Sequence, residues 1–399
     1  MAITDKEKGV WGLDQVYNKI NQGSIWEYSG AVQLWAWGNN AYGQVAQNNR
    51  TEYSSPVQIP GTNWAQLTGR GDPSGILATK TDGTLWVWGT NIGGNLGLND
   101  KTNPSSPTQV PGTTWSTTKH QLSGLYYANY AMKTDGTLWS MGYNNKGCLG
   151  LNAPETSHRS SPTQIPGTTW STVSGGMIGY GASGTKTDGT GWIWGSNSYG
   201  TLGLNQTHNQ QHRSSPTQIP GSWSRISRGD QWYSVLGRKT DGTLWSWGQG
   251  GDGQLGLNQP HNTALSSPTQ IGSDTTWTNE FVGSNKNWLA VKSDGTLWSW
   301  GENTRGALGQ NQAYAQLSAV SSPIQIPGTT WSQVAKNGFA ACMALKTDGT
   351  LWSWGYNGVT KGNLGLNDLL NRSSPTQIPG TWSNIFGSTP DHGFALRNV

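Results

Sequence analysis

Six aspartates recur at one phase of this sequence, and their carboxylates are the first groups to test for chemistry. Each follows Lys-Thr or Lys-Ser and precedes Gly-Thr: Asp82, Asp135, Asp188, Asp241, Asp294 and Asp348. General acid–base catalysis needs two carboxylates in unlike environments. Six equivalent positions do not supply that difference, whereas Asp-Gly favours a tight hairpin turn. We therefore predict that these aspartates are structural and that the protein is not an enzyme.

Histidine and cysteine are the next residue types that could do chemistry. Four histidines share one kind of Gln- and Asn-rich segment: His158, His208, His212 and His261. A metal site needs three or four convergent ligands with supporting groups, which such segments do not indicate. The two cysteines, Cys148 and Cys342, occupy unrelated positions and form no CxxC motif. The sequence thus predicts no metal, no cofactor and no disulfide framework.

Two Arg-Gly-Asp tripeptides, at 70–72 and 228–230, suggest cell adhesion at first sight. Both precede a hairpin lysine by nearly the same number of residues. This shared phase favours a turn of a structural repeat over an adhesion motif.

Charge and hydropathy exclude several classes of protein. Charged residues are 12% of the 399, the formal net charge is +4, and no Lys/Arg block occurs. A nucleic-acid-binding surface needs clustered basic residues, so we predict no nucleic-acid partner. No apolar run approaches a membrane span, and the first 20 residues lack the apolar core of a signal peptide. We expect synthesis in a cytoplasm and no membrane insertion.

An internal repeat must position all these residues. A Leu-Trp-x-Trp-Gly element or close variant recurs at steps of 51 to 54 residues, with its first tryptophan at Trp35, Trp86, Trp139, Trp192, Trp245, Trp298 and Trp352. A GxLGLN signature and an SSPTQIPGTTW signature follow in each unit, with variants. Alternation in LWSWG, the Asp-Gly turn before it and the Pro-Gly turn after it indicate short strands. About four strands per 53-residue unit predict an all-β, seven-bladed β-propeller.

The two ends of the repeat predict how the ring closes. The first unit lacks the lysine-containing strand before Leu34, and the last residues, GFALRNV, match CMALKTD. This match aligns Ala395 with Ala344 and Arg397 with Lys346. We therefore expect the N- and C-terminal strands to pair in one sheet, which removes open sheet edges. The predicted domains are a leader, residues 1–30, and a propeller, residues 31–399.

The pattern ALKTDGTLWSWGxNxxGxLGLN…SPTQI resembles the regulator-of-chromosome-condensation (RCC1) repeat, over about 90% of the chain. The resemblance implies a seven-bladed propeller that acts by binding proteins. The particular repeat pattern of this chain, KTDGTLWSWG…SSPTQIPG, is similar to that of bacterial and phage members of the family. The family usually places a histidine three residues before the small residue of the AL strand, and only His392 does so here.

Candidate contact residues lie where the repeat varies. Twenty of the 24 tryptophans occupy repeat positions, and we expect these to pack between blades. Trp232 and Trp288 do not, so they are candidate contact residues. Between the Asn of GxLGLN (Gln47 in unit one) and the Ser pair, loop lengths range from 5 to 9 residues. Length variation in repeats concentrates on binding faces. These loops supply further candidates: Tyr53, His158, His208, His212, His261, Tyr314 and Leu369.

The leader, GVWGLDQVYNKINQGSIW, resembles a short segment of tailed-phage virion proteins. Its apolar residues are candidates for an anchor: Trp11, Leu13, Val16, Tyr17, Ile20 and Trp26. An alternative is a plug folded against the first blade.

The leading hypothesis from sequence is a non-enzymatic virion protein of the phage tail or capsid. Residues 1–30 would bind other virion proteins, and the variable loops would bind a host-surface protein or glycan. One alternative is a cytoplasmic protein-binding module, either a GTPase exchange factor or an inhibitor similar to the secreted β-lactamase-inhibitor propeller. No loop between the fixed signatures exceeds nine residues, which argues against the wedge insertion of exchange factors. A lectin with sites repeated in each blade is the other alternative.

Overall fold

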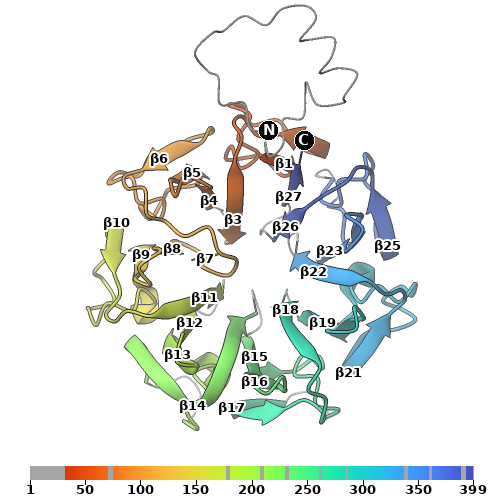
Figure 1. Ribbon diagram of the computed structural model, residues 1–399. Coiled ribbons are helices and arrows are strands. Elements are labelled where there is room, and N and C mark those ends of the chain that lie inside the picture. The colour runs from red at the N-terminus through yellow and green to blue at the C-terminus, as the bar shows by residue number, and fades with distance from the viewer. Residues whose placement is uncertain are drawn as a thin grey trace, which may run out of the picture.

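The computed structural model describes residues 32–70, 75–176, 180–206, 211–229, 233–259, 263–283, 286–336, 340–358, 362–387 and 392–398. Over these ranges the chain forms seven four-stranded antiparallel blades arranged in a ring (Figure 1). The predicted all-β propeller is confirmed. The leader, residues 1–30, lies outside the described residues.

The blades, numbered along the chain, have the following strands. Blade I comprises β3 (Trp64–Arg70), β4 (Gly75–Lys80), β5 (Leu85–Gly89) and β6 (Thr108–Val110). Blade II comprises β7 (Leu122–Gly124), β8 (Ala128–Met132), β9 (Leu138–Gly142) and β10 (Arg159–Gln164). Blade III comprises β11 (Trp170–Gly176), β12 (Gly181–Lys186), β13 (Thr190–Gly195) and the first half of β14 (Arg213–Arg228). Blade IV comprises the second half of β14, β15 (Ser234–Lys239), β16 (Leu244–Gly250) and β17 (Thr263–Gln270).

The remaining blades follow the same order. Blade V comprises β18 (Trp277–Gly283), β19 (Asn287–Lys292), β20 (Leu297–Glu302) and β21 (Ala319–Ile326). Blade VI comprises β22 (Trp331–Lys336), β23 (Ala341–Lys346), β24 (Leu351–Gly355) and β25 (Arg372–Ile378). Blade VII comprises β26 (Asn384–Phe386), β27 (His392–Asn398), β1 (Val32–Gly38) and β2 (Tyr53–Gln58). Three 3₁₀ turns occur among the described loops: η2 (Asn145–Gly147), η3 (Ser198–Gly200) and η4 (Thr304–Gly306).

Blade VII is the seam, because it combines strands from both ends of the chain. Strand β1 pairs antiparallel with β27 in the order β2-β1-β27-β26. Ala395 lies opposite Trp35, as Ala344 lies opposite Trp352 in blade VI. The predicted pairing is therefore present in the predicted register.

Each Asp-Gly hairpin is held by a hydrogen-bond relay. In blade I the Asp82 Oδ1 accepts from the Thr84 backbone N–H at 3.0 Å and from the Thr84 hydroxyl at 2.6 Å. The Trp86 Nε1–H donates to the Thr84 Oγ1 at 2.8 Å. The Thr84 hydroxyl and backbone N–H lower the pKa of Asp82, because both donate to its carboxylate. The same relay recurs in blades II to VI, so the recurring aspartates belong to turns, as predicted.

A lysine completes each of these hairpins. Lys80 Nζ lies 4.8 Å from the Trp64 ring centroid and 4.6 Å from that of Trp86. Such cation–π contacts are worth about 0.5–1 kcal/mol at exposed sites. Equivalent lysines contact two tryptophans in the next five blades: Lys133, Lys186, Lys239, Lys292 and Lys346.

The second tryptophan of each LWxWG element connects neighbouring blades. Trp194 is fully buried in blade III, and its Nε1–H donates to the Cys148 carbonyl of blade II at 2.8 Å. Gly150, two residues after Cys148, has φ +70°, and a Cβ there would lie 2.9 Å from the Trp194 Nε1. The glycine of LGLN therefore makes room for the next blade's indole. Met141 replaces this tryptophan in blade II and is also fully buried.

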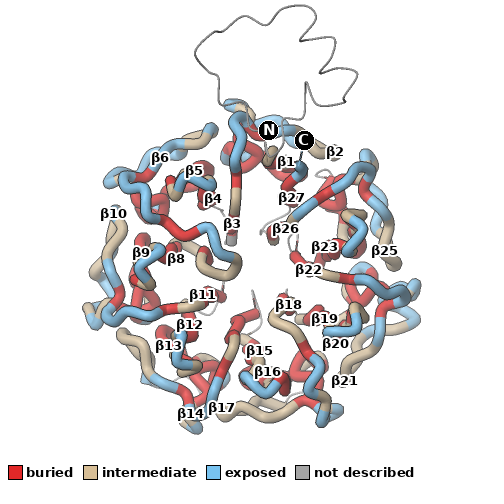
Figure 2. The backbone as a smooth tube through the Cα atoms, in the orientation of Figure 1, coloured by how far each residue is buried: buried red, intermediate tan, exposed pale blue. Residues whose placement is uncertain are grey.

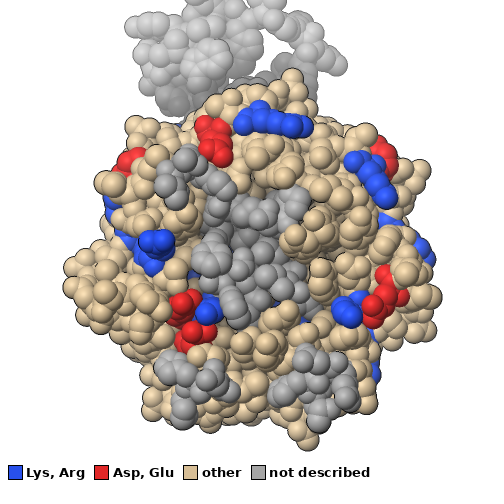
Figure 3. Space-filling view, turned by 180° about the vertical axis from the view of Figure 1, so that it is seen from behind, with Lys and Arg blue, Asp and Glu red and all other residues tan. Residues whose placement is uncertain are grey.

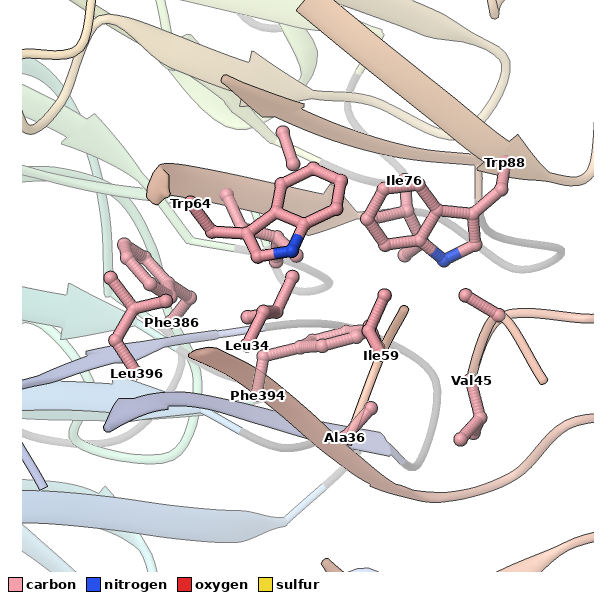
Figure 4. Close-up of a cluster of buried hydrophobic side chains, with 13 residues drawn as sticks. Leu34, Ala36, Val45, Ile59, Trp64, Ile76, Trp88, Phe386, Phe394 and Leu396 are labelled. Carbon is pink, nitrogen blue, oxygen red and sulfur yellow. The ribbon is translucent and has the colours of Figure 1, made fainter. Parts of the chain in front are cut away.

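The core is divided among the blades and their interfaces, and buried segments lie inside each blade (Figure 2). One cluster closes the ring between blades VII and I (Figure 4). There Leu34 and Phe394 of blade VII pack against Trp64 and Trp88 of blade I. Tryptophans make up most of the largest fully buried side chains in this chain of four phenylalanines, and each buries apolar surface worth about 25 cal/mol per Å².

Candidate functional site

The described loop candidates lie in different blades and do not converge on one site. Tyr314 and Leu369 are 50% and 47% exposed. The Tyr53 hydroxyl, in blade VII, accepts from the Asn49 Nδ2 at 3.0 Å. His158 and His212 use their Nδ1 atoms to accept the backbone N–H groups of Asn144 and Asn197, so both shape their own loops. His208, His261 and Trp232 lie outside the described residues, as does the predicted anchor of Trp11, Leu13, Val16, Tyr17, Ile20 and Trp26.

The expectation that Trp288 contacts a partner is wrong. Trp288 is 1% exposed and belongs to a core cluster with Leu236 and Phe281. Its Nε1–H donates to the Ser234 hydroxyl at 3.1 Å. This tryptophan lies outside the repeat pattern because it fills a gap between blades IV and V, and a surface role is not available to it.

The second Arg-Gly-Asp tripeptide begins with a buried arginine. Arg228 is 2% exposed at the end of β14, and its guanidinium lies beside Gly181. Burial lowers the pKa of Arg228 to about 10. An arginine in this position does not face a receptor, which agrees with the repeat-turn interpretation.

A group of tyrosines, here called the tyrosine arc, spans the loops of blades II to IV. Its members are Tyr126, Tyr127, Tyr143, Tyr180, Tyr199 and Tyr233. The Tyr127 ring centroid lies 4.2 Å from that of Tyr126 and 5.3 Å from that of Tyr143. Tyr199 and Tyr233 form a second pair at 5.0 Å. Tyr199 is 38% exposed and the others are partly buried, so the arc presents both ring faces and hydroxyls.

The electrostatics of the arc connect its two pairs. Burial, the hydrogen bond of Tyr126 and the nearby Tyr143 and Tyr180 raise the pKa of Tyr127 to about 12. Burial, Tyr199 and Tyr180 raise the pKa of Tyr233. Tyr180 thus lies near both groups, and the raised pKa values keep the phenols of Tyr127 and Tyr233 neutral at neutral pH. Neutral, amphipathic rings with polar tips are the side chains enriched at protein-binding surfaces.

A second irregular feature, here called the strap, comprises residues 117–121 between β6 and β7. Three positions separate Trp64 from Leu67 in blade I, whereas seven separate the equivalent Trp115 and Leu122, so blade II carries four extra residues. The strap reaches toward the centre of the ring (Figure 1), and its Lys119 and His120 line a cavity there. Its His120 carbonyl accepts from Val173 N at 2.9 Å, which fixes it against blade III.

The strap makes an ion pair with blade V. The Lys119 Nζ lies 2.9 and 2.8 Å from the two carboxylate oxygens of Glu280 on β18. Although burial opposes ionisation, Lys119 and His120 hold the pKa of Glu280 at about 2. Burial and the Arg225 charge lower the pKa of His120 to about 3, so this imidazole is neutral at neutral pH. The surrounding cavity is lined by the first strands of all seven blades. We call the Lys119–Glu280 pair the clasp.

Sequence reasoning missed both features. Six of the 13 tyrosines form the arc, but their spacing follows no single motif, and neighbouring blades bring them together. The longer segment between Trp115 and Leu122 was a detectable signal for the strap.

Charge and metal ligands add no further site within these ranges. The face opposite that of Figure 1 carries charges of both signs, scattered rather than gathered in one patch (Figure 3). Among the described residues, no group of three or more His, Cys, Asp or Glu side chains could hold a metal ion. The same part of the chain has no helix long and apolar enough to cross a membrane.

Comparison with known proteins finds the same repeat in a family model and in two related proteins. The family model described as the regulator of chromosome condensation (RCC1) repeat matches residues 33–67, 82–117, 135–177, 188–232, 241–285 and 294–336. The ultraviolet-B receptor UVR8 of Arabidopsis thaliana is 24% identical over 361 residues, or 90% of this chain and 79% of the receptor. The human RCC1-like G exchanging factor-like protein is 31% identical over 210 residues, 49% of this chain and 41% of that protein.

Solved structures show the same fold. The crystal structure of Prp20p from Saccharomyces cerevisiae superposes with a TM-score of 0.79 at 17% identity, covering 92% of both chains; that protein was studied for its binding to Gsp1p and histones. Human WBSCR16 superposes with a TM-score of 0.75 at 19% identity, covering 92% of this chain and 99% of the other.

Proposed function

The chain belongs to the RCC1-repeat family, and from this premise we propose that it is a protein-binding propeller whose contact surface is the tyrosine arc. The observation that carries the proposal is two groups of partly exposed tyrosines on neighbouring blades, one of three rings and one of two, with Tyr180 electrostatically close to a member of each. Tyrosine supplies a large, rigid contact area and loses little conformational entropy on binding. The relatives named above are an ultraviolet-B receptor and an RCC1-like G exchanging factor-like protein, which favours this reading over a virion role.

Site-specific photo-crosslinking tests the surface directly. A photoreactive residue replaces Tyr143 or Tyr199 in the full chain, which is then irradiated in extract of its source cells. The matched control carries the same residue at Thr168, an exposed position in a Pro-Gly turn. We expect a discrete protein adduct from the two arc positions and none from position 168. Equal adducts from all three positions, or none from the arc, would contradict the proposal.

Nucleotide exchange is a second candidate function, favoured by the 31% identity to the human exchanging-factor-like protein over about half the chain. Release of a fluorescent nucleotide from purified small GTPases measures it. Acceleration by the wild-type chain that is lost in the Tyr143→Ala/Tyr199→Ala double variant would support exchange through the arc. Unchanged release rates would reject exchange and leave the crosslinking result to decide on binding.

A virion role rests on the leader, residues 1–30, and its resemblance to phage proteins. In that case the crosslinked adduct is a particle or host-surface component, and the chain is present in purified particles. Mass spectrometry of such particles tests this role independently of the arc.

A further inference from the structure

Lys336 and Cys342 form a buried pair inside blade VI. Lys336 ends β22, Cys342 lies opposite it on β23, and the two are 1% and 0% exposed. The Lys336 Nζ lies 3.2 Å from the Cys342 Sγ and 3.0 Å from the Asn287 Oδ1 of blade V. The sulfur also lies 3.3 Å from the Ala307 carbonyl oxygen. An amine and a thiol are therefore held in contact at the boundary of two blades.

The charge of Lys336 lacks the usual compensation. Within the described residues, no carboxylate lies within ion-pair distance of its Nζ, since its contacts are the Asn287 amide oxygen and the Cys342 sulfur. A buried ammonium without a counter-ion is strongly unfavourable. Burial raises the pKa of the Cys342 thiol, while Lys336 lowers it. The polar neighbours of Nζ are thus an amide oxygen and a thiol, which leaves the sulfur as its partner for reaction.

We propose that Lys336 and Cys342 are a redox modification site, at which dioxygen converts the pair into a covalent bridge with one oxygen between Nζ and Sγ. The thiol loses its S–H hydrogen and the neutral amine loses one N–H hydrogen. One oxygen atom of dioxygen becomes the bridge, and the other leaves with these two hydrogens as water. Sulfur and nitrogen are oxidised and dioxygen is reduced, so atoms and electrons balance.

The geometry favours an oxygen bridge over a direct nitrogen–sulfur bond. A direct bond would draw the two atoms from 3.2 Å to single-bond length inside a close-packed interior. An intervening oxygen fills most of the existing gap. Dioxygen is small and apolar, and it enters buried sites more readily than charged oxidants. The bridge would tie β22 to β23 and remove a buried charge.

The other cysteine is a matched control within the same chain. Cys148 is 1% exposed, and its Sγ lies 3.2 Å from the Tyr143 carbonyl oxygen. Among the described residues, no lysine contacts the Cys148 sulfur, so the two thiols have burial in common but not an adjacent amine. The proposal therefore predicts a modification at Cys342 and none at Cys148.

Mass spectrometry of the full chain tests the bridge. Protein prepared in air without reductant should gain about 14 Da relative to protein prepared without dioxygen, and a thiol reductant should reverse the gain. Trypsin should no longer cleave after Lys336, and one cross-linked peptide should contain both residues. The Cys148→Ala variant should keep the gain, and the Lys336→Met and Cys342→Ala variants should lose it.

Wild-type protein decides the question even where a variant fails to fold. A free Cys342 thiol together with ordinary cleavage after Lys336, in air-exposed folded protein, would overturn the proposal. A mass gain that maps to Cys148 or to methionine would overturn it as well.

Discussion

Blade VII and the six other blades share one strand pairing but differ at the hairpin. In blades I to VI, the first tryptophan donates to a threonine hydroxyl that itself donates to the turn aspartate. In blade VII, Gln33 takes the threonine position, and the Trp35 Nε1 has no hydrogen-bond partner among the described residues. Trp37 still donates to the Asn363 carbonyl of blade VI at 2.9 Å. The contact between neighbouring blades is therefore common to all these blades. The hairpin relay is an extra feature, and it forms only where one continuous chain supplies the Asp-Gly turn.

Removing the strand that completes the seam is expected to have the largest effect. A chain that ends at Gly387 loses β27, including the fully buried Phe394 and Ala395. Loss of Phe or Leu side chains alone costs about 2–5 kcal/mol each, against a typical total stability of about 5–15 kcal/mol. We expect no cooperative thermal transition by circular dichroism and strong aggregation. The Arg397→Lys variant, which restores the residue of the other blades, is the control and should melt like wild type.

The clasp is a second contact between distant parts of the chain, and its contribution to folding stability can be compared with that of the seam. Glu280→Gln removes the carboxylate that pairs with Lys119, whose side chain is 30% exposed while that of Glu280 is 19% exposed. Partial exposure places the loss below that of a fully buried pair, at about 1–3 kcal/mol. Chemical denaturation at pH 7 measures it. An effect as large as that of the truncation would contradict the ranking.

The pH dependence follows from the lowered pKa of Glu280. Its value is about 2 in the folded protein and 4.5 ordinarily, so the unfolded chain binds the proton first as the pH falls. The stabilisation is complete above about pH 4.5 and is lost as the pH falls through about 2. The difference in melting temperature between wild type and Glu280→Gln should shrink from pH 6 to pH 3. A constant difference would show that the carboxylate charge is not responsible.

Breaking the relay in an ordinary blade should have a smaller effect. Thr84→Val keeps the side-chain shape and removes the hydroxyl that joins Asp82 to Trp86. Loss of two hydrogen bonds at a partly exposed turn should destabilise the protein by about 1–2 kcal/mol. Equilibrium denaturation measures the change, with Thr168→Val as an exposed control expected within about 0.5 kcal/mol of wild type. Equal effects of the two substitutions would show that the hydrogen-bond relay does not stabilise blade I.

Installing the relay at the seam should have the smallest effect. Gln33→Thr places a hydroxyl at the position from which the other blades accept the indole N–H. The turn aspartate is absent there, so one hydrogen bond at most is gained. We expect stabilisation of about 0.5–1 kcal/mol, read as a small rise in melting temperature. A fall in stability would mean that Gln33 already serves Trp35 better than threonine would.

The propeller fold was predictable from the sequence because every unit repeats the same contacts. The register of Ala395 opposite Trp35 followed from aligning one blade with another. The proposed contact surface was harder to predict, since Tyr127, Tyr180 and Tyr233 come from different blades and are near one another only in the folded chain. Trp288 was misassigned because departure from a repeat indicates either a surface role or local filling of the core, and only the burial distinguishes the two.

Strand β14 has a mechanical consequence for recognition. It leads from the last strand of blade III into the first strand of blade IV, pairing with β13 on one side and β15 on the other. The register with β13 shifts between Ile219 and Ser222, where Gly221 has φ +110°, so a short Pro-Gly connection joins these two blades and limits movement between them. Three members of the arc, Tyr180, Tyr199 and Tyr233, adjoin strands of this pair. A partner that docks there would meet a preorganised surface, so less of its binding free energy would be spent on restricting motion between blades.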